Sequence, residues 1–344
     1  MPGELFTVYC SLLTIHRSQI TITKNHMQAI PYLVAALLLP AAAQAQTYPA
    51  KPIRLIVPFA PGGPNDLLAR MVGQKVTEQS AQAVVIENRA GAGGTVGMDA
   101  AARSPGDGYT LVMGGSSNMT VAPNLYAKLP YDSVRDFTPV INVAHVPYAV
   151  AVNPTVPAKN AQDLIAAARA RGLSYGSSGT GSMSSLAAEL FKAMAKADIV
   201  HVPYKGTAPA LTDVISGQID MIFADLATVR PHASSGKVRV LALCGSKRSA
   251  SAPGIATISE SALKGYAIEP WFGVVGPANL PRDIVSRLNQ MIQSGLKAAD
   301  SQQRLASLGY DAIGGSPEQF AATIKADLAV YARIVKAAGI KTDL

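Results

Sequence analysis

The chain has 344 residues, of which 49% are hydrophobic, 6% aromatic and 15% charged, with a formal net charge of +8 at pH 7. It is longer than one typical domain of about 100 to 200 residues, and its apolar content excludes an intrinsically disordered protein. The basic residues are dispersed and no aromatic-rich basic stripe accompanies them, which argues against a nucleic-acid partner. A modest positive field would instead help to capture small anions.

The N-terminal segment has the features of a secretory leader. An apolar run, Pro31 to Pro40, follows the basic residues Arg17 and Lys24, and Ala43-Gln44-Ala45 is a small-x-small cleavage pattern. The apolar run is too short to span a bilayer. We therefore expect a signal peptide over residues 1–45, cleaved after its last alanine, and a periplasmic mature protein. A buried N-terminal helix is the alternative, and Met27 is an alternative start.

Four segments of the chain share one pattern: an apolar strand-like run, then a short loop of Gly, Ser, Thr and Pro, then a helical pattern. The runs are 54–59, 109–113, 173–175 and 200–204, and the loops that follow them are 60–66, 114–117, 176–182 and 205–207. In an open α/β sheet such loops lie at the carboxyl ends of the strands, where ligands bind. The free N–H groups of each following helix point to the same edge, which favours an anion.

The first part of the chain alternates strands with helices. Strands are expected at 53–59, 83–87 and 109–113, and a helix that Asn65 or Asp66 opens has an apolar face from Leu67 to Val76. The glycines of Gly91-Ala-Gly93-Gly-Thr-Val-Gly97 do not have the G-x-G-x-x-G spacing of a dinucleotide loop. We interpret this segment as a tight turn and a close helix contact.

The middle and the tail of the chain predict a second sheet and a return to the first. An apolar stretch at 143–152, broken by Pro147, fits a strand that crosses between domains. Helices are expected at 158–171, 183–195 and 209–217, with strands at 173–175, 199–204 and 219–224 that would form a second parallel sheet. After an apolar segment at 268–275 come helices at 282–297, 301–308 and 317–338, with no strand after them. The expected organisation is an α/β protein with a discontinuous lobe 1 (46–144 and 271–344), a lobe 2 (145–270) and a cleft between them.

Seven motifs, in order along the chain, resemble the Bug receptors, the extracytoplasmic solute receptors of tripartite tricarboxylate transporters. They are Tyr48-Pro-Ala-Lys-Pro-Ile-Arg-Leu-Ile-Val-Pro-Phe-Ala-Pro-Gly-Gly63, Asn88-Arg-Ala-Gly-Ala-Gly-Gly94, Asp107-Gly-Tyr-Thr-Leu111, Lys128-Leu-Pro-Tyr-Asp132, Asp136-Phe-Thr-Pro-Val140, His201-Val-Pro-Tyr-Lys-Gly206 and Trp271-Phe-Gly273. The resemblance implies a two-lobed, type II-like Venus-flytrap fold of the periplasmic binding proteins. It also implies a small carboxylate ligand, bound largely through main-chain groups and waters, and a tripartite tricarboxylate-type permease as partner. We expect a monomer that needs no cofactor or metal.

The resemblance and the four loops together define a candidate ligand site. The family's first binding loop maps onto the segment before residue 67, and the other three loops supply hydroxyls and glycines. The candidate residues are Phe59, Ala60, Gly62, Gly63, Asp66, Ser116, Ser177, Gly179, Thr180, Gly181, Ser182, Lys205, Gly206, Thr207 and Asp225. Asp66 and Thr207 are expected to be helix N-caps, and Ser182 is a ligand contact or simply a cap.

Two positions of the candidate site bear on specificity. Asp225 follows a buried strand, and its carboxylate would hold a ligand ammonium or hydroxyl, or serve as another cap or a lobe-closing pair. Exchange for Asn would then alter the discrimination between amino and plain diacids. Ser185 stands where relatives commonly carry a histidine, so this chain lacks any contact that depends on that imidazole.

Catalytic patterns are weak by comparison. Gly172-Leu-Ser174-Tyr-Gly176 matches G-x-S-x-G, but Ser174 would lie inside a strand rather than at the turn that a nucleophile elbow requires. His201 or His232 with Asp213 or Asp225 has no informative spacing, and no metal-ligand or phosphate-loop motif occurs. Cys244, the one cysteine after the leader, is expected to be a buried thiol. A secreted hydrolase that uses Ser174 and a sensor receptor remain the alternatives to transport.

Overall fold

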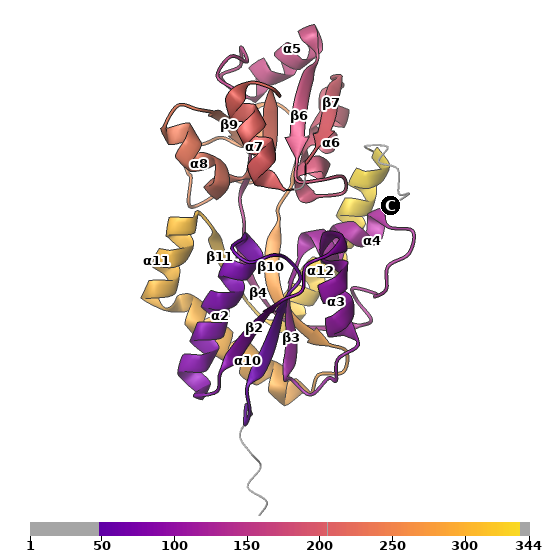
Figure 1. Ribbon diagram of the computed structural model, residues 1–344, viewed down its shortest axis with the longest axis vertical. Helices are drawn as coiled ribbons and strands as arrows, with labels where there is room; N and C mark the ends of the chain where they lie inside the picture. Colours follow the sequence, from indigo (N-terminus) through magenta and orange to yellow (C-terminus); the bar gives the residue numbers. More distant parts are fainter. Residues whose placement is uncertain (1–47, 205, 338–344) are drawn as a thin grey trace, which may run out of the picture. The chain divides into compact units, whose positions relative to one another are not determined.

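A computed structural model describes residues 48–204 and 206–337. The predicted signal peptide and Lys205 lie outside these residues. The described residues belong to one compact unit that is built on two β-sheets (Figure 1). Over these two ranges, no helix combines the length and the apolar character that a membrane crossing requires.

The first sheet has six strands in the order β11-β4-β10-β3-β1-β2. They are β1 (Ile53–Val57), β2 (Val84–Asn88), β3 (Thr110–Gly115), β4 (Phe137–His145), β10 (Trp271–Pro277) and β11 (Asp311–Gly314). Strand β1 pairs in parallel with β2 and β3, whereas β10 is antiparallel to β3 and β4, and β11 is antiparallel to β4. The sheet therefore combines strands from the early and the late part of the described chain.

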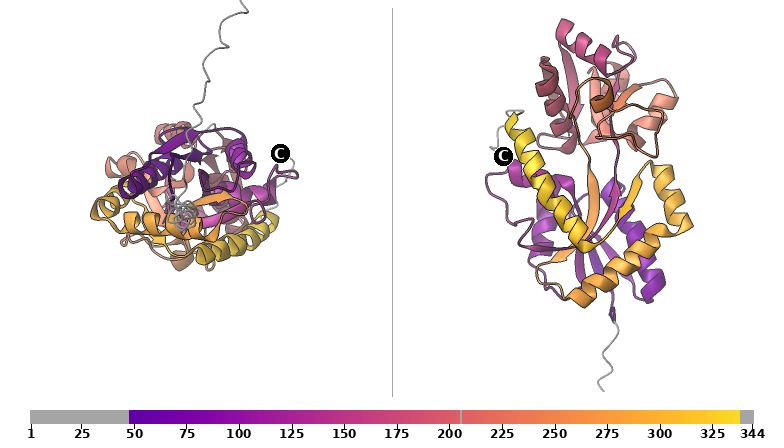
Figure 2. Two further views of the ribbon diagram at one scale, coloured as in Figure 1. Left: turned by 90° about the horizontal axis from the view of Figure 1, so that it is seen from below. Right: turned by 180° about the vertical axis from the view of Figure 1, so that it is seen from behind.

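Helices cover both faces of the first sheet, because successive side chains of a strand point to opposite faces. Leu55 and Val57 pack with α2 (Pro64–Ser80) and α10 (Arg282–Lys297). Ile56 packs on the other face with α3 (Thr95–Ala102) and α12 (Pro317–Ala337). Figure 2 shows α10 and α12, in orange and yellow, running beside this sheet. The tail of the chain thus packs back on the first sheet.

The second sheet has five strands in the order β7-β6-β8-β5-β9. They are β5 (Tyr148–Val152), β6 (Leu173–Ser177), β7 (Ile199–Pro203), β8 (Met221–Asp225) and β9 (Arg239–Leu243). The three strands predicted to form a second parallel sheet, β6, β7 and β8, are indeed parallel to one another. The sheet as a whole is mixed, because β5 is antiparallel to both β8 and β9. Strand β5 enters this sheet directly from β4 of the first sheet, through Val146 and Pro147.

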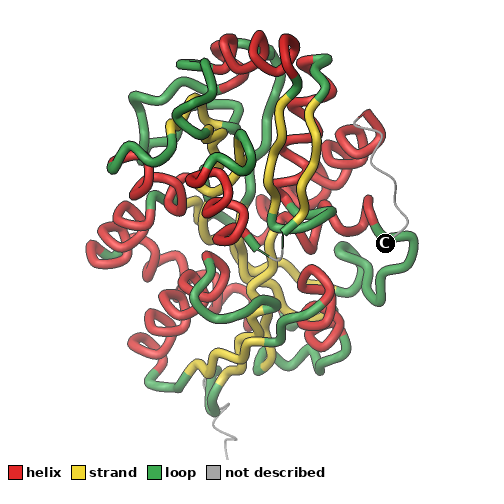
Figure 3. Tube along the Cα trace, turned by 45° about the horizontal axis from the view of Figure 1, so that its top comes forward, coloured by secondary structure: helices red, strands yellow, loops and turns green. Residues whose placement is uncertain are grey.

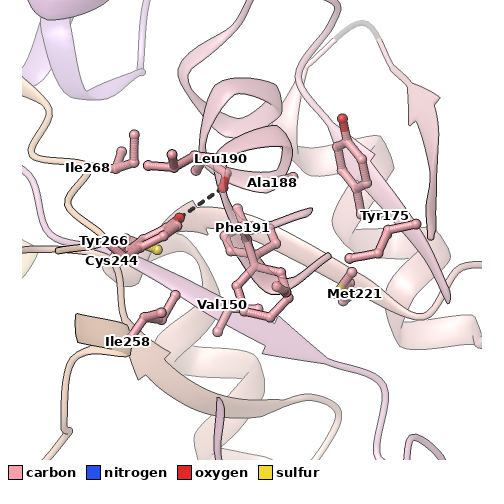
Figure 4. Packing of buried hydrophobic residues seen from close by; sticks show 14 of the residues in the cluster. Val150, Tyr175, Ala188, Leu190, Phe191, Met221, Cys244, Ile258, Tyr266 and Ile268 are labelled. Atoms are coloured by element: carbon pink, nitrogen blue, oxygen red, sulfur yellow. Dashed lines mark hydrogen bonds between the residues drawn. The ribbon is translucent and has the colours of Figure 1, made fainter. Parts of the chain in front are cut away.

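Four helices sandwich the second sheet. Helices α5 (Ala161–Arg171) and α6 (Met183–Ala195) pack on one face, and α7 (Thr207–Ser216) and α8 (Leu226–Ser234) pack on the other. Figure 3 shows these helices in red beside the yellow strands. In the core under α6, the Tyr266 hydroxyl donates to the Ala187 carbonyl oxygen at 2.9 Å, next to the buried Cys244 thiol (Figure 4).

Short elements complete the described chain. They are η2 (Ala92–Gly94), η3 (Ser117–Val121), α4 (Ala122–Leu125), α9 (Ile258–Ser261) and α11 (Ala299–Leu308). The sequence missed β11, an edge strand of four residues between α11 and α12, because such a short segment shows no clear alternation of apolar residues. It also missed α8, which begins directly after β8.

Candidate functional site

The sheet topology brings the four predicted loops to two strand edges. Strands β1 and β3 are parallel neighbours, so the loops at 58–63 and at Ser116 leave the same edge of the first sheet. Strands β7 and β8 both run parallel to β6, so the loop at 178–182 and the ends of β7 and β8 share one edge of the second sheet. These are the edges where open α/β sheets bind ligands.

Exposure divides the candidate residues into two groups. Ala60, Gly62 and Thr180 are exposed, and half-buried positions are Phe59, Gly63, Gly179, Gly181, Ser182, Gly206 and Thr207. The side chains with most hydrogen-bonding capacity are buried instead: Asp66, Ser116, Ser177 and Asp225 are 2%, 2%, 0% and 6% exposed. What the site offers to a ligand is therefore mainly backbone, and the buried polar side chains hold that backbone in place.

Asp66 holds the first loop together. Its carboxylate accepts hydrogen bonds from the Gly62 N–H at 3.0 Å, from Asn88 Nδ2 at 3.0 Å and from Arg70 Nε at 2.9 Å. Asn88 also donates to the Phe59 carbonyl oxygen at 3.1 Å. The predicted N-cap role of Asp66 was wrong, because α2 begins one turn earlier than expected: Gly63 is the N-cap and Asp66 lies in the first turn.

The environment of Asp66 favours its charged form. Burial by itself would raise the pKa of this carboxyl group, but the hydrogen bonds from Arg70, Gly62 and Asn88 outweigh burial and lower the pKa below its usual value. The carboxylate is thus already saturated by protein donors. An anionic ligand in this loop is left with the backbone N–H groups at the start of α2.

Helices α2 and α7 both begin at a glycine without a side-chain cap from a described residue. Their N-caps are Gly63 and Gly206, and a Cβ added to either glycine, or to Gly62, would meet no atom within 4 Å. The backbone at both helix starts is therefore open around these glycines, and it carries no side-chain cap from a described residue. Thr207, predicted as the N-cap of α7, is instead its first residue, and Lys205 lies outside the described residues.

Two buried asparagines, Asn65 of α2 and Asn118 of η3, bond to the end of β3, and the sequence analysis did not assign them to the site. Asn65 Nδ2 donates to the Met113 carbonyl oxygen at 3.1 Å, and Asn118 Oδ1 accepts from the Gly115 N–H at 3.0 Å. They satisfy backbone groups of β3 beyond the end of its pairing with β1. The Ser116 hydroxyl points inward and accepts from the Trp271 N–H at 3.4 Å. The available signal for Asn118 was its position directly after a glycine-rich strand end.

The loop after β6 is stabilised by its own hydroxyls. Ser182 is the N-cap of α6 and accepts from the Ser185 N–H at 3.2 Å, which confirms the cap interpretation. Ser184 Oγ accepts from the Ser178 N–H at 2.9 Å and lies 2.9 Å from Ser182 Oγ. The buried Ser177 hydroxyl lies 2.6 Å from His201 Nε2. The part of this loop left for a ligand is the backbone around Thr180.

The sequence and structure comparisons identify the protein's family. The family model described as "Tripartite tricarboxylate transporter family receptor" matches residues 68–340. The chain belongs to this family. Protein BugT of Bordetella pertussis (strain Tohama I) is 34% identical over 318 residues, which cover 92% of this chain and 98% of BugT. A UPF0065 protein of Pseudomonas sp. (strain P51) is 35% identical over 297 residues, covering 86% and 88% of the two chains.

Solved structures of related receptors share the fold. Rpa4515 of R. palustris, solved with adipate, has a TM-score of 0.79 and 35% identity over 86% of this chain and 99% of its own. MatC from Rhodopseudomonas palustris, solved with bound malate, has a TM-score of 0.75 and 29% identity over 84% and 100%. The predicted resemblance to the Bug receptors and the periplasmic-binding-protein fold are thus confirmed.

Asp225 has a structural role in this receptor. Both carboxylate oxygens lie 2.8 Å from Thr228 Oγ1, and one also accepts from the Thr228 N–H at 2.9 Å, so Asp225 is the N-cap of α8. Burial raises the pKa of its carboxyl group despite these hydrogen bonds. The cap is one of the roles expected from the sequence, and an additional contact with the ligand stays a prediction.

The patterns that suggested other chemistry have structural explanations in the receptor. Ser174 lies within β6, as predicted, where its hydroxyl donates to Asp220 Oδ2 at 2.9 Å and accepts from the Asp220 N–H at 3.1 Å. Cys244 is fully buried, also as predicted, and burial raises the pKa of its thiol to about 12. Within 48–204 and 206–337, no cluster of three or more His, Cys, Asp or Glu could hold a metal ion.

Proposed function

We propose that this receptor binds a small organic carboxylate between two lobes, residues 46–144 with 271–344 and residues 145–270, and delivers it to a tripartite tricarboxylate-type permease. The exported receptor captures its ligand in the periplasm, and closure of the two lobes encloses the ligand. A ligand can favour the closed state only by as much as it binds that state better than the open one. Transport rather than signalling is the use that the family description supports.

The observation that carries the proposal is the pair of uncapped helix starts at accessible glycines. Gly63 and Gly206 leave the first-turn N–H groups of α2 and α7 free of side-chain caps from described residues, and the space around both glycines is open. Each helix start contributes about 0.3 to 1 kcal/mol to binding an anion. Two such starts suit a dicarboxylate with a negative group at each end.

Carboxylate specificity is further supported by the related structures. Rpa4515 was solved with adipate and MatC with malate, both of which are dicarboxylates. The hydrolase alternative has less support, because the Ser174 hydroxyl is engaged by Asp220 on both its donor and its acceptor side. Ser174 also lies inside β6 rather than at the strand-to-helix turn that a nucleophile elbow requires.

The first prediction is that small dicarboxylates stabilise the mature receptor. At 100 times its dissociation constant, a ligand that binds only the folded state adds about 2.7 kcal/mol to the free energy of unfolding. Thermal unfolding should therefore shift upward by several degrees with adipate, malate or a related diacid, and calorimetry should give a stoichiometry near one. Neutral diamides of the same acids provide the control, since they keep the carbon chain and lose the charge.

Two outcomes would contradict the proposal. One is a diamide that stabilises the protein as much as its diacid, because the site would then not recognise an anion. The other is a chemical change in the bound acid after prolonged incubation, detected by mass spectrometry of the released ligand, because a receptor releases its ligand unaltered.

A further inference from the structure

His201 contacts the residue that precedes the candidate ligand loop at 178–182, although His201 is not itself one of the candidate ligand residues. Its Nε2 lies 2.6 Å from the Ser177 hydroxyl, and this hydroxyl lies 3.1 Å from both the N–H and the carbonyl oxygen of Gly179. Ser177 itself is 0% exposed, so its side chain faces the protein. The hydroxyl is therefore a bridge between β7, which carries His201, and the loop that begins at residue 178.

The imidazole of His201 is held in one orientation. It stacks on the ring of Tyr175 with a centroid separation of 4.6 Å and an interplanar angle of 7°. The Tyr175 hydroxyl donates in turn to Glu189 Oε1 at 2.6 Å, which ties the stacked pair to α6. Burial lowers the pKa of His201, which keeps the ring neutral near pH 7 and able to accept a hydroxyl proton.

The loop that the bridge restrains contains two glycines. Gly179 and Gly181 have φ angles of 125° and 76°, which lie in the left-handed region, and neither carries a side chain to limit its motion. The Ser177 carbonyl oxygen also accepts from the Tyr204 N–H at 3.0 Å, so the start of this loop is bonded to the end of β7 twice. If the loop is already fixed before the ligand arrives, it loses less conformational entropy on binding, and binding is tighter.

We propose that His201 is a positioning residue for ligand binding, which fixes the 178–182 loop through the Ser177 hydroxyl without touching the ligand. The inference rests on the proposed function, because it assigns this loop to the carboxylate site. The inference predicts that the side chains of His201 and Ser177 act as one unit. Removing either should have the same effect on affinity, and removing both should add little.

The experiment is a double-mutant cycle in the mature protein, with calorimetric binding of adipate and malate. His201→Phe keeps the stacking on Tyr175 and removes the hydrogen bond, Ser177→Ala removes the hydroxyl, and the double variant removes both. Loss of one such hydrogen bond should weaken binding about tenfold. The double variant should also be about tenfold weaker, rather than the hundredfold expected of independent residues. His201→Gln, whose amide oxygen can accept the Ser177 hydroxyl proton in place of Nε2, should recover most of the affinity.

Amide exchange in the ligand-free protein supplies a second measurement. Exchange of the 178–182 amides should be about tenfold faster in His201→Phe than in the wild type and near normal in His201→Gln. Val200→Ala is the matched control, since Val200 is 61% exposed on the same strand. It should leave both affinity and loop exchange unchanged.

The outcomes separate this inference from the proposed function. Unchanged affinity and unchanged loop exchange in His201→Phe would overturn the positioning role, as would a hundredfold loss in the double variant. If the wild type binds neither acid, the proposed function fails for these two ligands. Loop exchange in the ligand-free variants still tests the restraint on the loop in that case, and normal exchange in His201→Phe overturns it.

Discussion

Replacing Gly97 by alanine is expected to destabilise the receptor and to impair ligand binding. Gly97 is a buried residue of α3, and a Cβ at this position would lie 2.7 Å from Pro58 Cα, 2.8 Å from Pro58 Cβ and 2.9 Å from the Arg89 carbonyl oxygen. Two of these three atoms belong to the backbone, so no rotamer change relieves the contact. Overpacking of this kind costs about 3 kcal/mol, from which the better helix propensity of alanine recovers about 1 kcal/mol.

The effect should reach the ligand site because Pro58 immediately precedes Phe59 and the first loop. Displacing Pro58 moves the strand end that positions the start of α2. We therefore expect a net loss of about 2 kcal/mol in the free energy of unfolding and about tenfold weaker binding of the acid that stabilises the wild type. Urea denaturation with linear extrapolation gives the first quantity and calorimetry the second.

Gly73→Ala is the matched control for this substitution. Gly73 is also a buried helical glycine, but its added Cβ would meet only side-chain carbons of Val84 and Ile86, at 3.2 to 3.4 Å. Side chains of the edge strand β2 can shift by a few tenths of an ångström, so the loss of stability should be much smaller. Equal losses in the two variants would show that the backbone contact with Pro58 does not set the cost.

The second large effect is expected from Asp66→Ala. The variant removes the acceptor for Gly62, Asn88 and Arg70 at once, so the first loop loses the contact that holds it against β2. Hydrogen bonds to a charged group contribute about 1.5 to 3 kcal/mol each, but Arg70 is half exposed and contributes little. We expect a loss of about 3 kcal/mol in the free energy of unfolding. Loss of the loop geometry should also abolish measurable ligand binding.

Arg70→Ala separates the ion pair from the rest of the network. It leaves the bonds from Gly62 and Asn88 to the buried carboxylate intact, so the loss should stay below about 1 kcal/mol. Near-equal losses in Arg70→Ala and Asp66→Ala would contradict this assignment, since the exposed ion pair would then account for the whole effect. Urea denaturation of both variants at pH 7 makes the comparison.

The stabilisation from Asp66 has a defined pH dependence. Because the pKa of this carboxyl group is lower in the folded protein than in the unfolded chain, its contribution is complete above the unfolded pKa of about 3.9. It is lost as the pH falls further, through the folded pKa. The difference in stability between the wild type and Asp66→Ala should therefore stay constant from pH 7 to about pH 5 and shrink below about pH 4. A difference that shrinks already between pH 7 and pH 6 would exclude Asp66 as its source.

Local patterns in the sequence were sufficient to predict most elements. Helix α6 was predicted over its observed range, Met183–Ala195, because Ser182 provides a cap and apolar residues follow at helical spacing. Helix α10 has its predicted bounds, Arg282–Lys297, because apolar residues recur along it at helical spacing. The glycines at 91–97 form a turn and a tight helix contact, as their spacing indicated. In this contact Gly97 packs directly on Pro58. Signals of this kind lie within a few residues of the element that they specify.

The chain by itself determined that strand ends rich in Gly and Ser precede helix starts, which is a local property that points to an anion site. Only the tertiary structure decided which of these groups remain free for a ligand. Asp66 is saturated by Arg70 and Asn88, and Ser177 is held by His201 of a neighbouring strand, through contacts 22 and 24 residues apart in the chain. Strand order and direction bring such partners together, and strand pairing is a long-range choice that no short pattern encodes. For the same reason, the direction of β5 and the pairing of β11 could not be predicted from the sequence.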